Sequence, residues 1–190
     1  MVYKSYQSFK LSPIWILIAV NFLVFIATTI APALMEHLAL KPTALPTSPW
    51  TIVTSLFVHS NLWHIAANMF TLYFFGRYVS RLIGERKLLI VYFGGGILGS
   101  ILHILSGSYI PGVGASGAVF SLGGVLAVMR PKLKVFVLPI PVPIPLWIAV
   151  IGGFFILASF PRVALAAHLG GLVFGLATGY LFRKRERYFF

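Results

Sequence analysis

Cysteine and aspartate are both absent from this chain, and acidic residues of any kind are scarce. Its 190 residues include only three acidic ones, which are Glu36, Glu85 and Glu186. Without cysteine, disulfides, thiolate catalysis and cysteine-ligated metals are excluded. The three glutamates lie outside the apolar runs, so no carboxylate pair is available inside a membrane for aspartyl-protease or proton-relay chemistry.

Apolar residues, by contrast, are abundant. Hydrophobic residues make up 59% of the chain and charged residues only 9%. Several apolar runs are long enough to cross a hydrocarbon core of ~30 Å, so we expect an all-α membrane protein. The 15 lysines and arginines lie between the apolar runs. That placement indicates membrane topology rather than binding to nucleic acid.

Six apolar segments are predicted to be transmembrane helices, and we expect one polytopic membrane domain over residues 1–190. The segments cover residues 13–34, 62–78, 88–105, 116–129, 146–160 and 163–182, with short basic tails outside a core of about 14–182. Residues 35–61 form a long connection that we expect to lie in the interface or dip into it. Prolines alternate over residues 139–145, which predicts an extended interfacial segment over residues 138–145.

The basic residues are distributed unevenly between the two sides of the predicted bundle. If the N-terminus is cytoplasmic, 13 of the 15 lysines and arginines lie on the cytoplasmic side, and only Lys41 and Arg162 lie outside. The positive-inside rule then predicts six spans with both termini in the cytoplasm.

Ser116 has small neighbours, Gly114 and Ala115 before it and Gly117 after it, and it precedes an apolar run that continues to Met129. Small neighbours let a backbone approach a serine closely. The free N–H groups of a helix's first turn point to the same place and suit a developing negative charge. Ser116 is therefore a candidate nucleophile. Small-residue patterns also pack membrane helices, so this motif alone does not distinguish catalysis from packing.

Four polar residues within the predicted spans lie at a common depth. Counted from the basic residue that ends each span on the inner side, Ser116 lies roughly 21 Å and His168 roughly 22 Å above the inner boundary. Asn68 lies roughly 20 Å above it, and His64 one helical turn higher. In a hydrocarbon core of ~30 Å, the four residues share one level below the outer surface.

Stripes of small residues predict which helices meet. One face of the last span carries Ala164, His168, Gly171, Gly175 and Gly179, and one face of the fourth carries Ser116, Gly123 and Ala127. Such stripes allow two helices to pack backbone to backbone, which would bring Ser116 and His168 together at the top of the contact. His64 and Asn68, four residues apart, project from one face of the second span.

Chemistry assigns a role to each of these groups. A serine hydroxyl is a weak nucleophile that needs an adjacent base, and His168 is available for it. Because the chain has no aspartate, the pair would be a Ser–His dyad rather than a triad. Asn68 and His64 carry donors suited to an oxyanion, alongside the backbone N–H of Ser116. We expect the reaction to be acyl transfer to water, as the cleavage of a peptide bond within or beside a membrane helix.

Each residue also has a purely structural interpretation. A histidine or an asparagine in a membrane helix can hold two helices together by hydrogen bonds. His59, His64 and His168 could together hold a metal, but no carboxylate or cysteine completes a ligand set, so we expect neither a metal nor another cofactor. The coincidence of four groups at one depth favours catalysis.

Three motifs in this order resemble those of the rhomboid intramembrane serine proteases. They are His64-x-x-x-Asn68, Gly114-Ala115-Ser116-Gly117 and Ala167-His168-x-x-Gly171-x-x-x-Gly175. The resemblance covers about residues 14–182. It implies a compact six-helix bundle, a membrane-embedded loop over residues 35–61, Ser116 as nucleophile, His168 as base, and His64, Asn68 and the Ser116 amide as the oxyanion hole. The chain departs from the family pattern at Trp50-Thr51, commonly Trp-Arg, and at Ser80, where an acidic residue is often found.

We therefore expect an intramembrane serine endopeptidase that acts on single-span membrane proteins within the lipid bilayer, in the cytoplasmic membrane of a prokaryote. One alternative is a catalytically inactive rhomboid-like protein that binds membrane clients, although such proteins typically lack the serine or the histidine. Another is a small transporter, which would more often have internal repeats and charged residues at the bilayer midplane. The sequence has neither feature.

Overall fold

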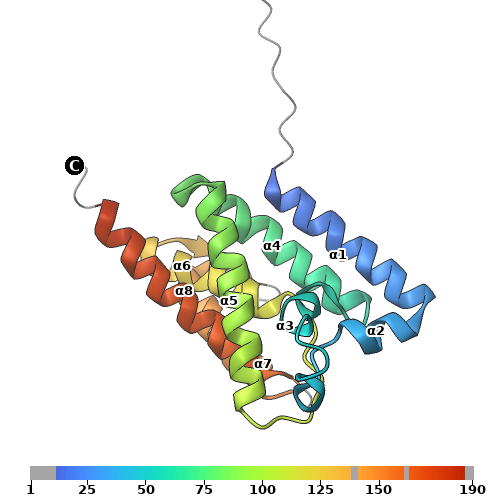
Figure 1. The fold of residues 1–190 in the computed structure, drawn as a ribbon. Coiled ribbons are helices and arrows are strands. Elements are labelled where there is room, and N and C mark those ends of the chain that lie inside the picture. Colours follow the sequence, from blue (N-terminus) through green and yellow to red (C-terminus); the bar gives the residue numbers. More distant parts are fainter. Residues whose placement is uncertain (1–11, 138–140, 161–162, 187–190) are drawn as a thin grey trace, which may run out of the picture.

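The structure is a computed structural model that describes residues 12–137, 141–160 and 163–186, with side chains described up to Arg183. Within these residues it is mostly α-helical (Figure 1). The helices are α1 (Pro13–Ile30), α2 (Pro32–Leu38), α3 (Thr51–Thr54), α4 (Leu62–Ile83), α5 (Glu85–Leu105), α6 (Ser116–Met129), α7 (Leu146–Ala158) and α8 (Leu165–Glu186). Two 3₁₀ turns, η1 (Pro42–Ala44) and η2 (Ser55–Phe57), and two strands, β1 (Lys134–Val135) and β2 (Ile144–Pro145), complete the described elements.

Three of the described helices are long and apolar enough to cross a membrane. They are α1, α5 and the Leu165–Arg183 part of α8. Helices α6 and α7 are also apolar but have only 14 and 13 residues. At 1.5 Å per residue, α6 is ~21 Å long and shorter than a hydrocarbon core. These helices agree with the predicted membrane protein. The count of six spans stays a prediction.

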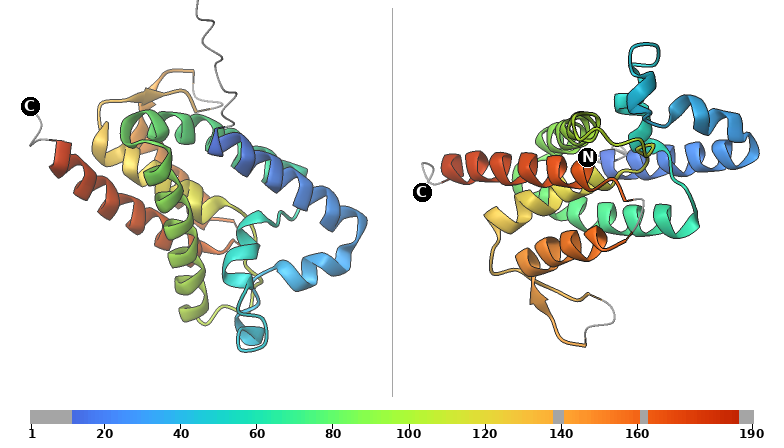
Figure 2. Two further views of the ribbon diagram at one scale, coloured as in Figure 1. Left: turned by 45° about the horizontal axis from the view of Figure 1, so that its top comes forward. Right: turned by 90° about the horizontal axis from the view of Figure 1, so that it is seen from below.

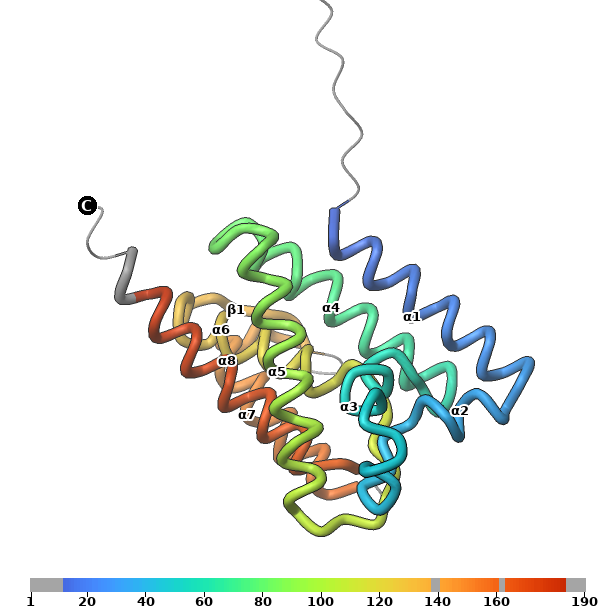
Figure 3. The backbone as a smooth tube through the Cα atoms, viewed as in Figure 1, coloured from blue at the N-terminus to red at the C-terminus, as the bar shows by residue number. Residues whose placement is uncertain are grey.

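Helix α6 lies at the centre of the bundle. It packs against α8, α5, α4 and α7, and ten of its residues are buried. Helix α1 packs on α4, and α1 and α8 lie on opposite sides of the molecule, as the tube in Figure 3 and the views in Figure 2 also show. The buried core is built mainly from apolar side chains of α4, α5 and α6. This arrangement encloses the start of α6, where Ser116 lies.

The first predicted span was too long at its C-terminal end. We expected it to run to about Leu34, but α1 ends at Ile30 and α2 begins at Pro32. Ala31, between them, has φ −124° and ψ 85° and leaves the helical conformation. The cause is local, because the proline ring disfavours α-helical geometry in the residue that precedes it.

The remaining predicted spans match helices whose ends differ by a few residues. Helix α4 continues past the predicted end at Tyr78 and stops at Ile83, followed by Gly84 with φ 83°. Helices α5 and α8 likewise include polar residues that an apolar run excludes. A helix can continue into polar sequence because its backbone hydrogen bonds do not depend on apolar side chains. It ends where a residue such as Gly84 takes a positive φ.

The connection over residues 35–61 is compact and tied down by its own hydrogen bonds. The Trp50 indole N–H donates to the His37 carbonyl at 3.0 Å, and the Thr54 hydroxyl donates to the Leu38 carbonyl at 2.8 Å. Lys41 forms an ion pair with Glu36. These bonds hold the second half of the connection against the C-terminal end of α2.

The proline-rich segment is extended where the structure describes it. Ile144–Pro145 pairs in antiparallel fashion with Lys134–Val135, while residues 138–140 lie outside the described residues. The extended conformation predicted for this segment is confirmed at residues 144–145. A small hairpin therefore joins α6 to α7 in an otherwise helical chain.

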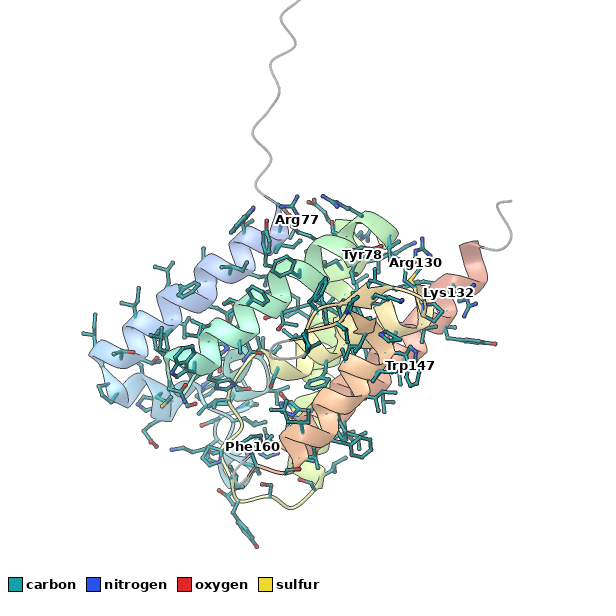
Figure 4. All side chains as sticks on the ribbon, turned by 180° about the vertical axis from the view of Figure 1, so that it is seen from behind. Arg77, Tyr78, Arg130, Lys132, Trp147 and Phe160 are labelled. Atoms are coloured by element: carbon teal, nitrogen blue, oxygen red, sulfur yellow. The ribbon has the colours of Figure 1, made fainter. Side chains whose placement is uncertain are left out.

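Basic side chains gather at one end of the bundle. Figure 4 shows Arg77, Arg130 and Lys132 at the end where α1 begins, and Phe160 at the other. The Arg183 guanidinium donates to the Val128 carbonyl at 3.3 Å, which places the end of α8 beside the end of α6. The segregation of charge used to predict topology is thus visible among the described side chains. Lys4, Lys10, Arg162 and Arg187 lie outside the described residues.

Candidate active site

Helices α6 and α8 touch through their backbones. A Cβ atom added to Gly171 would overlap the carbonyl oxygen of Gly117, and one added to Gly175 would overlap the carbonyl oxygen of Ser121. A Cβ atom on Gly179 would lie 3.0 Å from the Cα atom of Val125. The glycine stripe predicted on the last span therefore faces α6, as expected.

The matching stripe on α6 differs from the predicted one. We expected Gly123 on the face that meets the last span, but a Cβ atom there would lie 3.1 Å from Val150 on α7. Gly124 takes that place instead, with 2.8 Å from its added Cβ atom to the Leu176 amide nitrogen. Two adjacent glycines lie 100° apart on a helix, and their sequence does not reveal which one faces a given neighbour.

Helix α5 joins the same close contact, which the sequence reasoning missed. A Cβ atom on Gly170 would lie 2.7 Å from the Cα atom of Gly99, and one on Gly95 would overlap the side chain of Ser121. The Ser121 hydroxyl donates to the Val91 carbonyl at 2.8 Å. The signal was present as glycines at positions 95, 96 and 99 of an apolar helix, a pattern typical of close helix packing.

Ser116 and His168 meet at the top of the α6–α8 contact. The Ser116 Oγ lies 2.6 Å from His168 Nε2, a short hydrogen-bonding distance. Ser116 is the first residue of α6, and His168 lies in the first turn of α8. The His168 side chain is buried, whereas Ser116 is partly exposed. A hydroxyl within reach of a buried imidazole is the arrangement that nucleophilic catalysis requires.

The His168 ring is held by packing rather than by a carboxylate. Phe120, one turn along α6 from Ser116, lies against it with ring centroids 5.0 Å apart and an angle of 34° between the planes. His168 Nδ1 is buried and has no hydrogen-bond partner among the described residues. For Nε2 to accept the Ser116 proton, the ring proton must be on Nδ1. Phe120 was not among the predicted site residues.

His64 lies against the loop that carries Ser116. A Cβ atom on Gly114 would lie 2.6 Å from His64 Nε2, so only a glycine leaves room for the imidazole. Gly114 has φ 110°, which also favours glycine. His64 Nδ1 is 3.1 Å from the Ser60 hydroxyl, and the His64 amide donates to the Asn61 side chain at 2.9 Å. The residues at the start of α4 thus hold the His64 ring against Gly114, which lies two residues before Ser116 in the chain.

Asn68 lies one helical turn below His64 on the buried face of α4. Its side-chain amide donates to the His64 carbonyl at 2.9 Å. One N–H of the amide is used in this bond, which leaves the other as a donor. The structure therefore brings Ser116, His168 and His64 to one place, and holds Asn68 directly beneath His64.

His59 also belongs to this cluster, although from the sequence we considered it only as a possible metal ligand. It is 1% exposed, and its Nε2 lies 3.4 Å from the amide nitrogen of Ala115, which donates to it. Its ring meets that of His64 edge-on, with centroids 5.0 Å apart. Burial, and to a smaller degree His64, lowers the pKa of His59 to about 4, so the ring is a neutral acceptor near pH 7. A second histidine just before the helix that carries His64 was the available signal.

Backbone bonds fix the loop before Ser116 to the 35–61 connection. Leu40 and Gly112 exchange two hydrogen bonds, of 2.9 and 2.8 Å, and the Gly114 amide donates to the Ser55 carbonyl at 2.9 Å. On the other side, His103 Nε2 lies 2.7 Å from the Ile110 carbonyl. A cavity of about 30 Å³, bordered by Ser116, remains between this loop and its neighbours. That volume is large enough for a water molecule.

The described residues contain no group of three or more histidine, cysteine, aspartate or glutamate side chains that could hold a metal ion. His59 and His64 meet edge-on instead of converging on one point, and His168 bonds to Ser116. His168 is the side chain that bonds to the Ser116 hydroxyl, and His59 and His64 lie against the loop before it.

A rhomboid domain model matches residues 46–185, which is most of the chain. The chain belongs to the rhomboid family. It is 32% identical over 127 residues to the rhomboid protease GluP of Bacillus subtilis, covering 66% of this chain and 24% of GluP. It is 28% identical over 149 residues to the mitochondrial Rhomboid protein 1 of Saccharomyces cerevisiae, covering 73% of this chain and 43% of the yeast protein.

This rhomboid is also similar to a relative that is named inactive. It is 35% identical over 77 residues to the inactive RHOMBOID-like protein 8 of Arabidopsis thaliana, covering 40% of this chain and 22% of the relative. The chain spans less than half the length of each of these three relatives. Family membership thus establishes an integral membrane protein related to serine hydrolases, and the activity of this chain has to be argued from its own residues.

Proposed function

We propose that this rhomboid is an intramembrane serine endopeptidase that uses a Ser116–His168 dyad. The observation that carries the proposal is the 2.6 Å separation of Ser116 Oγ and His168 Nε2. Each residue lies at a helix start, where close backbone packing of α6 on α8 holds it. A serine hydroxyl needs such an adjacent base to become a useful nucleophile.

In the proposed reaction, the Ser116 proton passes to His168 Nε2 as Oγ bonds to the peptide carbonyl carbon. The carbonyl electron pair moves to the oxygen and forms a tetrahedral oxyanion. When this intermediate collapses, the C–N bond breaks and the leaving amine takes the proton from Nε2, which leaves an acyl-serine. Water then loses a proton to Nε2 and attacks the acyl carbon, and Ser116 departs with that proton.

The oxyanion would be bound by the Ser116 backbone N–H and by the side chains of His64 and Asn68. As the first residue of α6, Ser116 has no partner for its N–H within the helix. The contact of His64 with Gly114 supports its part in the hole, and Asn68 lies one turn below. Fixed donors of this kind stabilise charge that develops in the transition state. Gly114, Gly117, Gly171 and Gly175 support the site by allowing the close contacts.

We further propose that the chain is one membrane domain of six spans with both termini in the cytoplasm. The gathering of basic side chains at one end supports this orientation. Helix α6 is short, so its N-terminus would lie inside the bilayer, roughly 21 Å above its basic end. Water would reach Ser116 from the outer side, and the cavity beside Ser116 has room for it.

The substrates would be single-span membrane proteins cleaved in or near their membrane segment, and the location would be the cytoplasmic membrane of a prokaryote. Of the named relatives, GluP is a bacterial protease and the yeast protein is mitochondrial. We propose no metal, other cofactor or nucleic acid as a partner.

The decisive test uses the purified protein in lipid vesicles with a tagged single-span substrate. Ser116→Ala and His168→Ala should each abolish cleavage while the protein stays folded, and a chelator should have no effect. Ser159→Ala, an exposed serine at the end of α7, is the matched control and should cleave normally. Full activity in Ser116→Ala would overturn the mechanism.

The similarity to an inactive relative supports a second candidate function, the binding of membrane clients without cleavage. It predicts that the parent protein leaves every substrate intact and that Ser116 does not react with a fluorophosphonate. The close Ser116–His168 pair favours the enzyme, since a binding protein has no need of it.

A further inference from the structure

A second cavity lies far from Ser116, between the first turn of α1 and the last turns of α4. Its volume is about 240 Å³, and it is lined by Ser12, Ile14, Trp15, Arg77, Ser80 and Arg81. It is at the end of the molecule where the basic side chains gather, and Figure 4 labels Arg77 there. The candidate active site does not use any of these residues.

One arginine in this cavity is held in place by its neighbours. The Arg77 guanidinium donates to the Tyr73 hydroxyl at 2.7 Å and stacks over the Tyr73 ring at 5.3 Å from its centroid. The Trp15 ring also packs against the Tyr73 ring, with ring centroids 5.3 Å apart. Because a guanidinium has five N–H donors, Arg77 keeps most of them for a ligand after bonding to Tyr73.

The described side chains do not supply a carboxylate for these arginines. Among the described side chains, neither Arg77 nor Arg81 has a carboxylate within 4 Å, and Glu36 pairs with Lys41. The sequence of residues 1–11 contains no acidic residue. Two neighbouring cations therefore line an open cavity without a carboxylate partner among the described side chains.

The lining fits a phosphate group. Arginine presents a fork of donors that matches phosphate oxygens, and the hydroxyls of Ser12 and Ser80 add two shorter donors. The first turn of α1 lies at the cavity and brings the positive end of the helix dipole to it. Among the described residues the Ile14 N–H is its free amide, because Pro13 has none and those of Trp15 and Ile16 donate to the Ser12 carbonyl. The arginines and Ser80 of α4 and the first turn of α1 therefore face the same phosphate position from two sides.

The surroundings indicate that the phosphate belongs to a lipid. Trp15 is 52% exposed and Ile16 is 49% exposed on the outer face of an apolar helix, next to the cavity. Tryptophan is enriched where membrane helices meet the headgroup region. We propose that this cavity binds the headgroup phosphate of an anionic phospholipid, whose acyl chains lie along α1.

This site would fasten α1 to the bundle. Helix α1 has few partners apart from α4 and α2, and the cavity lies at the point where α1 and α4 meet. A phosphate held by groups on both helices would bridge them. The proposal does not depend on proteolysis, because none of its residues lies near Ser116.

Trp15 provides the probe for a direct test. A variant with Trp50, Trp63 and Trp147 changed to phenylalanine keeps Trp15 as its sole tryptophan, since the chain has four. In vesicles of chain-brominated phosphatidylcholine, bromine near the cavity quenches its fluorescence. Adding unbrominated phosphatidylglycerol should relieve quenching several-fold more than adding the same fraction of unbrominated phosphatidylcholine.

In the same background, Arg77→Gln with Arg81→Gln should abolish the preference for phosphatidylglycerol, because each arginine beside an anionic headgroup is worth roughly fivefold in affinity. The matched control is Lys132→Gln with Lys134→Gln, which removes two exposed positive charges from the same end of the molecule at a distance from the cavity. That variant should keep the preference. An equal loss in both pairs would mean a general attraction of the basic end to anionic lipid, and would overturn the proposal.

Two further outcomes bear on the source of the phosphate. If millimolar inorganic phosphate abolishes the preference, the cavity is a site for soluble phosphate and the lipid assignment fails. If the protein with its arginines intact relieves quenching equally with both lipids, the proposal fails without reference to any arginine variant. Persistence of the preference in phosphate buffer, together with its loss in the arginine pair, would establish the lipid site.

Discussion

Gly117 on α6 and Gly171 on α8 face each other so closely that a Cβ atom on Gly171 would overlap the Gly117 carbonyl oxygen. Gly117 follows Ser116, and Gly171 lies one turn after His168. The approach of these two backbones therefore sets the distance between Ser116 Oγ and His168 Nε2. Any residue larger than glycine would move the two helices apart at the dyad.

The first prediction concerns this contact one turn further along. Gly175→Val adds a branched side chain against the Ser121 carbonyl, and overpacking of this kind costs about 1–3 kcal/mol. A shift of about 1 Å is enough to lower catalysis on the order of a hundredfold. We expect lower thermal stability in detergent and the loss of most cleavage activity, although no proposed catalytic group is changed.

Gly152→Val is the control for that experiment. An added Cβ atom at Gly152, on α7, has no atom within 4 Å. This variant should keep activity and stability close to those of the parent. Equal activity in Gly175→Val and the parent would mean that the α6–α8 contact does not position the dyad.

The second prediction concerns the proposed oxyanion hole. His64→Ala and Asn68→Ala should each lower kcat, because the loss of one oxyanion donor commonly costs about 3 kcal/mol. The loss is smaller where the Ser116 amide and the remaining side chain compensate. Single-turnover cleavage rates would separate this effect from substrate binding. An unchanged kcat in the double variant would remove both side chains from the mechanism.

The third prediction separates backbone strain from the His64 contact. Gly114 and Gly107 both have positive φ values, of 110° and 68°, but only Gly114 has a neighbour, with His64 Nε2 2.6 Å from its added Cβ. Both alanine variants should lose stability, on the order of 1 kcal/mol from the backbone alone. Only Gly114→Ala should also lose cleavage activity. Similar activity in the two variants would show that displacing His64 has no consequence for turnover.

The fourth prediction is a pH dependence of stability that comes from His59. Its pKa is lowered from 6.5 to about 4 in the folded protein by burial and by His64. Protonation therefore favours the unfolded state, so this contribution is intact above pH 6.5 and is lost as the pH falls towards 4. The difference corresponds to about 3 kcal/mol.

His59→Gln keeps an acceptor for the Ala115 amide but does not titrate. Unfolding free energies of the parent and of this variant, measured in mild detergent from pH 7 to pH 4, should diverge as the pH falls, with the parent losing more stability. Parallel curves would mean that His59 is not held neutral by the fold.

Local signals in the sequence were sufficient for most of the helices. The six apolar runs match α1, α4, α5, α6, α7 and α8 in chain order, whereas the short helices α2 and α3 were not predicted. Gly84 and Pro32 mark helix ends that only local backbone rules explain. The break at Ala31 was missed because hydropathy continues across it. Apolar periodicity reports burial in lipid as well as in protein, so it does not locate a helix end inside an apolar run.

The candidate site was only partly accessible from the sequence. Depth along each helix and the glycine stripe on α8 were enough to expect that Ser116 and His168 meet. The contacts of His59 with Ala115 and of Phe120 with His168 depend on how a loop and a helix rotate against their neighbours. The rotation of each helix about its own axis is set by the packing of the whole bundle. For the same reason the sequence did not reveal that Gly124, and not Gly123, faces α8.

The two hydrogen bonds between Leu40 and Gly112 have a consequence for the order of folding. They join the connection after α2 to the loop before α6, and both α4 and α5 lie between them in the chain. We expect such a long-range pairing to form after the intervening helices have inserted and packed, because bringing together residues far apart in the chain costs loop-closure entropy. Ser116 would then acquire its surroundings in the last stage of assembly, and a nascent chain would carry an unfinished serine site until its final helix had docked.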